Sequence, residues 1–181
     1  TTYLGPLTGI GIPQDFGQLY VMGGDAGGVL FRTARVVEDS ECIKKLSIPK
    51  NSSAHCYTAW DVAKESRERF GSPTQGAVAA QAFTYRHDGL DSPLDGTLLG
   101  QLGFFGSNGY GNNGFFLDLP ANNINNVTVQ SVAHLFHGNW LDFQSRVASV
   151  EFNIFNPATN VVTSVRFFTE IAQTGLVRPS Y

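Results

Sequence analysis

The chain has 181 residues, and its 12 basic and 15 acidic side chains give a net charge of −3. This length suffices for one core, so we expect a single domain over residues 1–181. The weak negative charge disfavours a nucleic-acid partner, and no apolar run reaches the roughly 18 residues of a membrane-spanning helix. With 20 glycines and only 15% charged residues, the composition favours a loop-rich β protein.

The first third of the chain predicts strands separated by loops. Residues 1–28 are rich in glycine and proline and predict an extended segment with one short strand at 18–22. Residues 29–37 (VLFRTARVV) are rich in β-branched and aromatic side chains and predict a strand. Residues 61–69 have little apolar face, so they fit a short helix or a solvated helical turn equally well.

The middle of the chain predicts three strands and one helix. The strands are expected at 80–85, 97–105 and 115–119, the last of which stops at a proline. Apolar residues then recur at intervals of three and four, as on one face of an amphipathic helix. These residues are Val129, Val132, Ala133, Leu135 and Phe136, with Asn125 or Asn126 as the expected N-terminal cap and Gly138 as the C-terminal cap.

The last third predicts one long β-hairpin over residues 146–171. Its first strand alternates apolar residues (Ala148, Val150, Phe152, Ile154) with mostly polar ones. The turn is expected at 156–160, where Asn156-Pro157 initiates it and Asn160 tolerates left-handed backbone angles. The return strand, 161–171, places Val161, Thr163, Val165, Phe167, Thr169 and Ile171 on one face. Strands, then a helix, then a hairpin predict an α+β fold with a mainly antiparallel sheet.

Three segments carry candidate ligand chemistry, and for each we favour an ordinary structural role. Residues 109–114 (GYGNNG) match the letters of a dinucleotide-binding turn, but a strand is expected after them where that motif needs a helix. His134 and His137, with Asp142 as a third ligand, could hold a metal, yet histidine is also favoured in the last turn of a helix. A calcium loop would use His87, Asp88, Asp91 and Asp95, whose spacing fits no EF-hand.

The sequence offers no catalytic constellation. It contains no Gly-x-Ser-x-Gly motif and no P-loop, and its acidic residues are too scattered to select a pair for acid–base catalysis. We therefore expect a protein that is not an enzyme and that has no cofactor, metal or catalytic residue.

Two cysteines and two glycosylation sequons bear on the cellular setting. Cys42 and Cys56 either form a disulfide, worth roughly 3 kcal/mol for a loop of this size, or remain two buried thiols. N-glycosylation sequons begin at Asn51, inside this loop, and at Asn126. A sequon between two cysteines favours oxidising, extracellular surroundings. We expect Asn51 and Asn126 to be the glycosylated residues.

An ordered set of residues follows the pattern of a known family. It comprises Phe31-Arg32-Thr33-Ala34-Arg35-Val36, Cys42, Cys56-Tyr57, Phe115-Phe116-Leu117-Asp118-Leu119, Asn139-Trp140-Leu141-Asp142, Arg146, Phe152, Phe155-Asn156, Asn160, Val165, Glu170, Gly175 and Pro179-Ser180. In type and order these residues resemble the polycystin channels, in the extracellular TOP (polycystin) domain between their first and second transmembrane helices. The resemblance covers residues 29–181, whereas residues 1–28 match poorly.

The resemblance implies a function in a larger protein. It implies a Cys42–Cys56 disulfide, a TOP-domain fold, and an extracellular or luminal place on a plasma, ciliary or endoplasmic reticulum membrane. The expected function is subunit assembly and modulation of gating in a polycystin-like (TRP-type) cation channel. The expected partners are neighbouring subunits of a tetramer, the pore domain of the same chain, and extracellular-matrix or ciliary-surface proteins. The alternative is a secreted or surface-anchored adhesion or filament module with the same fold.

Overall fold

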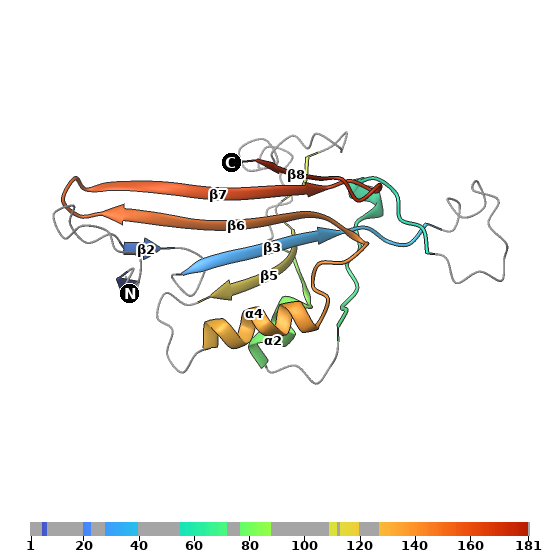
Figure 1. Cartoon of the computed structure of the whole chain (residues 1–181), viewed down its shortest axis with the longest axis horizontal. Coiled ribbons are helices and arrows are strands. Elements are labelled where there is room, and N and C mark those ends of the chain that lie inside the picture. The colour runs from blue at the N-terminus through green and yellow to red at the C-terminus, as the bar shows by residue number, and fades with distance from the viewer. Residues whose placement is uncertain are drawn as a thin grey trace.

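The structure is a computed structural model, and it describes residues 5–6, 20–22, 28–39, 55–71, 77–87, 109–111, 113–119 and 127–180. Its main feature is one antiparallel β-sheet of eight strands with two helices on one side (Figure 1). The strands are β1 (Gly5–Pro6), β2 (Tyr20–Met22), β3 (Val29–Arg35), β4 (Tyr85–Arg86), β5 (Gly114–Leu119), β6 (Ser145–Asn156), β7 (Val161–Ile171) and β8 (Val177–Ser180). The expectation of a mainly antiparallel sheet is confirmed.

The hairpin β6–β7 is the centre of this sheet. Its register runs from Val147 opposite Glu170 to Asn156 opposite Val161, so the strands are paired over almost their whole length. Asn160 takes a left-handed φ of 51° in the turn, as predicted. The other edge of β6 is shared by β3, along its first half, and β2, near its end. One strand thus connects most of the sheet.

The start of β6 contains a register shift in its pairing with β3, which the sequence pattern did not predict. Ala34 lies opposite Val147 but Arg35 lies opposite Ser145, so Arg146 is an extra residue in this strand. Such an irregularity re-aims side chains. Ser145, Arg146 and Val147 are consequently all buried. The predicted hairpin is confirmed, but burial does not follow its apolar residues: in β6 Ser149 is buried whereas Ala148 and Val150 are only partly buried, and in β7 the buried side chains are Phe168 and Glu170.

The helix α4 (Val127–His137) is confirmed, but its orientation and its end differ from the prediction. Leu135 faces the core, whereas Val129, Val132, Ala133 and Phe136 are exposed. The left-handed residue that ends the helix is Asn139 (φ 50°), and not the predicted Gly138. The Trp140 amide bonds the Leu135 carbonyl and the Asn139 amide bonds the Phe136 carbonyl, which is the Schellman arrangement.

The predicted strand at 80–85 is wrong for most of its length. Residues Ala77–Ala82 (AVAAQA) form helix α2, because alanine is the best helix former, and only Tyr85 and Arg86 join the sheet as β4. In 61–69 the helical turn is realised as a 3₁₀ helix, η2 (Val62–Lys64), with Asp61 as its N-cap. The predicted strand at 97–105 and the helix caps Asn125 and Asn126 lie outside the described residues.

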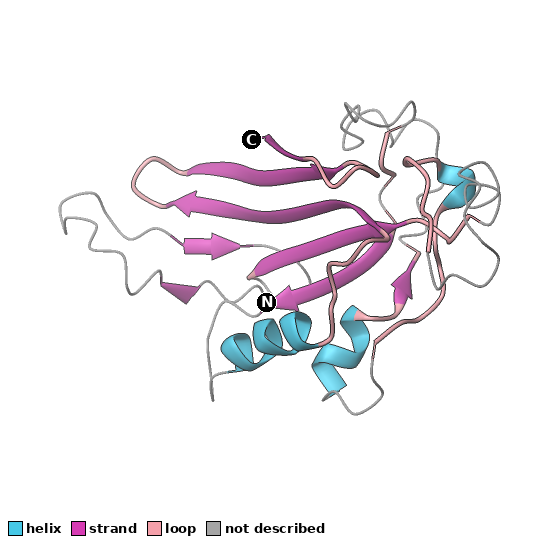
Figure 2. Cartoon of the chain, turned by 45° about the vertical axis from the view of Figure 1, so that its right-hand side comes forward, coloured by secondary structure: helices cyan, strands magenta, loops and turns pink. Residues whose placement is uncertain are grey.

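Two apolar cores lie on opposite faces of the sheet. On one face α2 packs against β5, and α4 packs beside α2 (Figure 2). We call this the helix-side core; it contains Ala82, Phe83, Phe115, Leu117, Leu119, Leu135 and Trp140. On the other face, chain segments without regular structure cover β3, β6 and β7. This loop-side core contains Ala34, Val36, Trp60, Tyr110, Val147 and Phe168.

Candidate interaction site

Three arginines on β3 and β6 are buried in this sheet. Arg32, Arg35 and Arg146 are 7%, 3% and 2% exposed. A buried guanidinium needs several acceptors to replace its water. In this fold the acceptors come largely from connecting segments, so each arginine fastens a loop to a strand.

Arg32 holds the segment that precedes β5. Its Nε and Nη2 donate to the Asn113 carbonyl at 3.1 and 2.9 Å, and Nη2 also donates to the carbonyls of Tyr110, at 3.1 Å, and Gly111. Burial lowers the pKa of Arg32 to about 10, and the Glu151 carboxylate partly offsets this effect. The carbonyls of Tyr110, Gly111 and Asn113 therefore converge on one strand side chain, and β5 follows them where a nucleotide site would need a helix.

Arg146 and Arg35 hold the connection between α4 and β6. Arg146 donates from Nε to the Thr58 carbonyl at 2.8 Å and from Nη1 to the Phe143 carbonyl at 2.9 Å. Arg35 pairs with Asp142 at 2.7 Å and donates to the Gln144 side chain at 2.7 Å. Burial lowers the pKa of both arginines, although the Asp142 carboxylate opposes this for Arg35. The segment 142–144 is thus fixed by two strands.

The side chain of Tyr110 locks the same region from the loop side. It is 1% exposed, and its ring centroid lies 5.0 Å from Trp60 and 5.6 Å from Phe168. Burial, and secondly the Glu170 carboxylate, raise the pKa of its hydroxyl. This part of the chain is therefore anchored, and the Tyr110 side chain is not available to a partner.

The loops fixed in this way present apolar side chains to solvent. Phe143 is 87% exposed, although its backbone carbonyl is held by Arg146 and its two neighbours by Arg35. Leu141 is also exposed, and both residues line a cavity of about 610 Å³ beside Ile171 and Gly175. An exposed apolar side chain on a rigid backbone loses little entropy on binding, which suits a protein interface. We call Leu141 and Phe143 the apolar corner.

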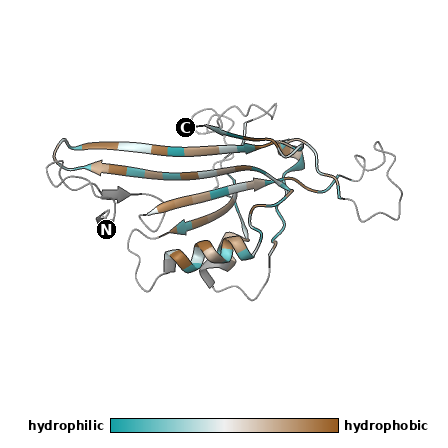
Figure 3. Ribbon diagram, in the orientation of Figure 1, coloured by the Kyte–Doolittle hydropathy of each residue, from teal (hydrophilic) through white to brown (hydrophobic). Residues whose placement is uncertain are grey.

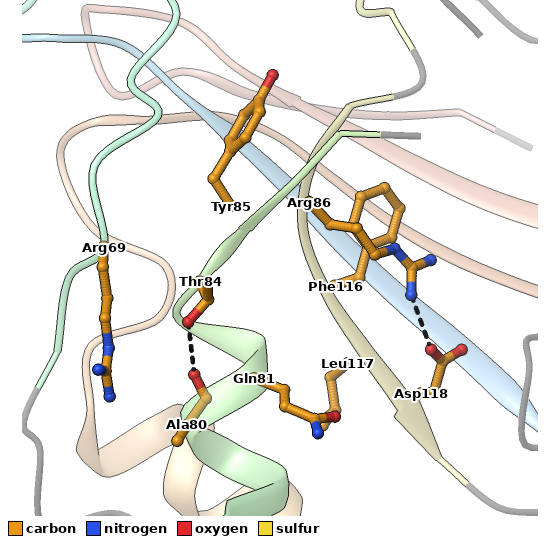
Figure 4. A pocket seen from close by; sticks show the side chains of 9 residues that line it. All are labelled: Arg69, Ala80, Gln81, Thr84, Tyr85, Arg86, Phe116, Leu117 and Asp118. Carbon is orange, nitrogen blue, oxygen red and sulfur yellow. Dashed lines mark hydrogen bonds and ion pairs between the residues drawn. The ribbon is translucent and has the colours of Figure 1, made fainter. Parts of the chain in front are cut away.

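A second pocket, of about 400 Å³, opens between α2 and the β4–β5 edge (Figure 4). Arg86, which lines it, pairs with Asp118 at 3.1 Å, and its guanidinium carbon lies 4.2 Å from the Phe116 ring centroid. The Thr84 hydroxyl donates to the Ala80 carbonyl at 3.1 Å. Figure 4 draws these two contacts, and the residues that line the pocket make no arrangement of nucleophile and base.

The predicted site residues are only partly within the described residues. Cys56 is included and Cys42, Asn51 and Asn126 are not, so the disulfide and both glycosylation sites stay predictions. Within the described ranges no group of three metal-ligating side chains forms, and Asp142 is bound by Arg35. Of the calcium-loop residues only His87 is described.

The sequence reasoning missed the three buried arginines as anchors. Their acceptors are mainly backbone carbonyls, which every residue carries and which leave no trace in a sequence. One available signal was their place inside otherwise apolar strands, since an arginine there must find partners when both faces of the sheet are covered.

Comparison with known proteins identifies the family of this chain. The family model described as the polycystin domain matches residues 21–181, so the chain belongs to the polycystin-domain family. Human polycystin-2-like protein 1 is 28% identical over 127 residues, which are 70% of this chain and 14% of that protein. The chain thus spans about one seventh of that relative's length. No helix within the described ranges is long and apolar enough to cross a membrane.

Proposed function

We propose that this chain is the extracellular or luminal TOP domain of a polycystin-like cation channel and that it mediates subunit assembly and modulates gating. The observation that carries the proposal is the match to the polycystin domain over residues 21–181. On this proposal residues 1–181 form one α+β domain without enzymatic activity, and its partners are the neighbouring subunits of a tetramer and the pore domain of the complete protein.

The structure supports an assembly role through the apolar corner. Phe143 is exposed on a segment whose backbone two buried arginines fix. A neighbouring subunit that covers this corner would bury apolar surface without ordering a loop. Gating would respond if the corner makes different contacts in the closed and open states, because only differential contacts shift such an equilibrium.

The test is to count the subunits in the complex that the complete protein forms when it is extracted from native membranes. After mild solubilisation we expect a four-subunit complex, and Phe143→Gln should shift the population towards smaller species while the monomer stays folded. Val162→Thr, which changes an exposed side chain near the hairpin turn, is the matched control. A complete protein that is secreted without a channel region would overturn the channel proposal and favour the adhesion module.

We also propose the Cys42–Cys56 disulfide in this setting. The backbones of Glu38 and Tyr57 form an isolated antiparallel β-bridge, and the Asp39 amide donates to the Cys56 carbonyl at 2.9 Å. The chain therefore leaves β3 and returns at adjacent positions, and a disulfide would close the segment between them at its base. The mass of the chain should rise by two hydrogen atoms when the disulfide is reduced to two thiols. Alkylation of both cysteines without reductant would contradict the pairing.

A further inference from the structure

Helix α4 carries an apolar stripe that faces solvent. Val129, Val132 and Phe136 are 62%, 42% and 81% exposed, and Ala133 between them is exposed too. The spacing i, i+3, i+4, i+7 puts these four side chains in one row along the helix. The opposite side, with Ser131 and Leu135, is buried against the protein. Figure 3 shows the hydrophobic residues of α4, and Figures 1 and 2 place it at the outer surface of the helical layer.

The stripe has no charged surroundings on its own helix. The sequence from Val127 to His137, VTVQSVAHLFH, contains no aspartate, glutamate, lysine or arginine. Helices that face solvent normally carry charged residues on their outer side. Here the exposed side consists of the apolar stripe flanked by Gln130 and His137, and a second copy of α4 would approach it without repulsion between like charges.

We infer that the stripe binds a second copy of itself about a two-fold axis. In an antiparallel pair centred between Val132 and Ala133, Phe136 of each copy lies over Val129 of the other. The large end of the stripe thus meets the smaller end, and Ala133 near the centre lets the helices approach closely. The stripe is self-complementary in size and in charge, which is what an isologous contact requires.

This contact is separate from the apolar corner of the proposed function and does not rest on it. Rings form through heterologous contacts, whereas an isologous contact pairs two copies and closes. The α4 contact would therefore join two assemblies rather than build one ring. Because α4 has 11 residues, about 16 Å of helix, the pair buries little area and binds weakly.

Sedimentation velocity on the 181-residue chain over a concentration series tests the inference. The chain is made in the bacterial periplasm, where cysteines oxidise and Asn126, next to α4, stays free of carbohydrate. We expect a concentration-dependent dimer. Phe136→Gln should raise its dissociation constant about tenfold or more, since the symmetric contact loses the side chain twice. Phe143→Gln makes the same substitution on the apolar corner and should leave the dimer intact.

A charge exchange tests the register. Phe136→Glu and Val129→Lys should each abolish the dimer, and the double variant should restore it, because each glutamate then faces a lysine of the other copy. Circular dichroism must show that all variants stay folded. A wild-type chain that is monomeric at every concentration overturns the inference. So does a dimer that Phe143→Gln dissolves and Phe136→Gln does not, or a double variant as weak as the single ones.

Discussion

Arg35 of β3 and Asp142 of the α4–β6 connection form an ion pair of 2.7 Å, with the guanidinium carbon also 3.4 Å from the Phe70 ring centroid. The arginine is buried and the carboxylate is partly exposed. One side chain therefore joins a strand, the connection that carries Phe143, and the segment before α2. This makes Arg35 a sensitive point for stability.

We expect Arg35→Met to lower the free energy of unfolding by about 2 kcal/mol, since the charged hydrogen bonds are lost while solvent still screens Asp142. Arg35→Lys should recover only part of this, because lysine cannot reproduce the planar, forked contact. Urea denaturation measures both. Glu38→Met is the control: its 3.0 Å pair with His55 joins two exposed side chains, and the change should stay within about 0.5 kcal/mol. Equal losses for both methionine variants would contradict the anchoring role.

Gly114, at the start of β5, is the position where the segment held by Arg32 joins the sheet. Its φ is 145°, and a Cβ there would lie 2.6 Å from the Thr33 carbonyl oxygen. We expect Gly114→Ala to destabilise the chain by about 2 kcal/mol, because both the backbone angle and the contact oppose it. Gly111→Ala offers a comparison in the same segment, where an added Cβ meets nothing within 4 Å. Thermal unfolding should separate the two variants clearly; a tolerated Gly114→Ala would refute this account of the turn.

The end of α4 allows a direct test of which residue caps it. Asn139, with φ 50°, should tolerate glycine and lose about 1 kcal/mol on substitution by alanine, which disfavours left-handed angles. Gly138 is not among the residues with positive φ, so Gly138→Ala should cost nothing and can gain helix propensity. Chemical denaturation of the two alanine variants decides the question. The reverse order of stabilities would restore Gly138 as the cap.

The hairpin and α4 were predictable because each has a clear period. What the period of α4 could not reveal is which way its apolar row faces: Val129 and Phe136 mark a face, but only the packing of Leu135 and Trp140 shows that the other side is buried. Helix α2 was missed because its alanines run directly into a strand-like Phe-Thr-Tyr, so local propensity changes within a few residues.

The candidate site was less predictable than the fold. Family resemblance identified the region of Arg32 and Arg146, but not that these side chains bind the carbonyls of Tyr110, Thr58 and Phe143. Such contacts join residues far apart in sequence through atoms common to all residues. The extra residue Arg146 in β6 likewise depends on pairing with β3, which alternation along one strand cannot express.

The buried hydroxyl of Tyr110 predicts a loss of stability in alkali. Burial and Glu170 raise its pKa in the folded chain, whereas in the unfolded chain tyrosine ionises near pH 10. The contribution of Tyr110 to the free energy of unfolding is therefore fully present below about pH 10. It decreases as the pH rises further, because only the unfolded state then releases the proton.

We expect Tyr110→Phe to reduce the slope of unfolding free energy against pH above about pH 10. The lowered pKa of Arg32 acts in the opposite direction, but it is common to both proteins and cancels in their difference. The pKa of Tyr85 is raised by burial and by its 2.8 Å hydrogen bond to Glu65, so Tyr85→Phe should also reduce the slope, by an amount that includes its electrostatic interaction with Arg32. Urea midpoints measured across this pH range give the slopes. If the Tyr110→Phe curve runs parallel to that of the wild type, Tyr110 ionises in the folded chain and the closed packing described for it against Trp60 and Phe168 is wrong.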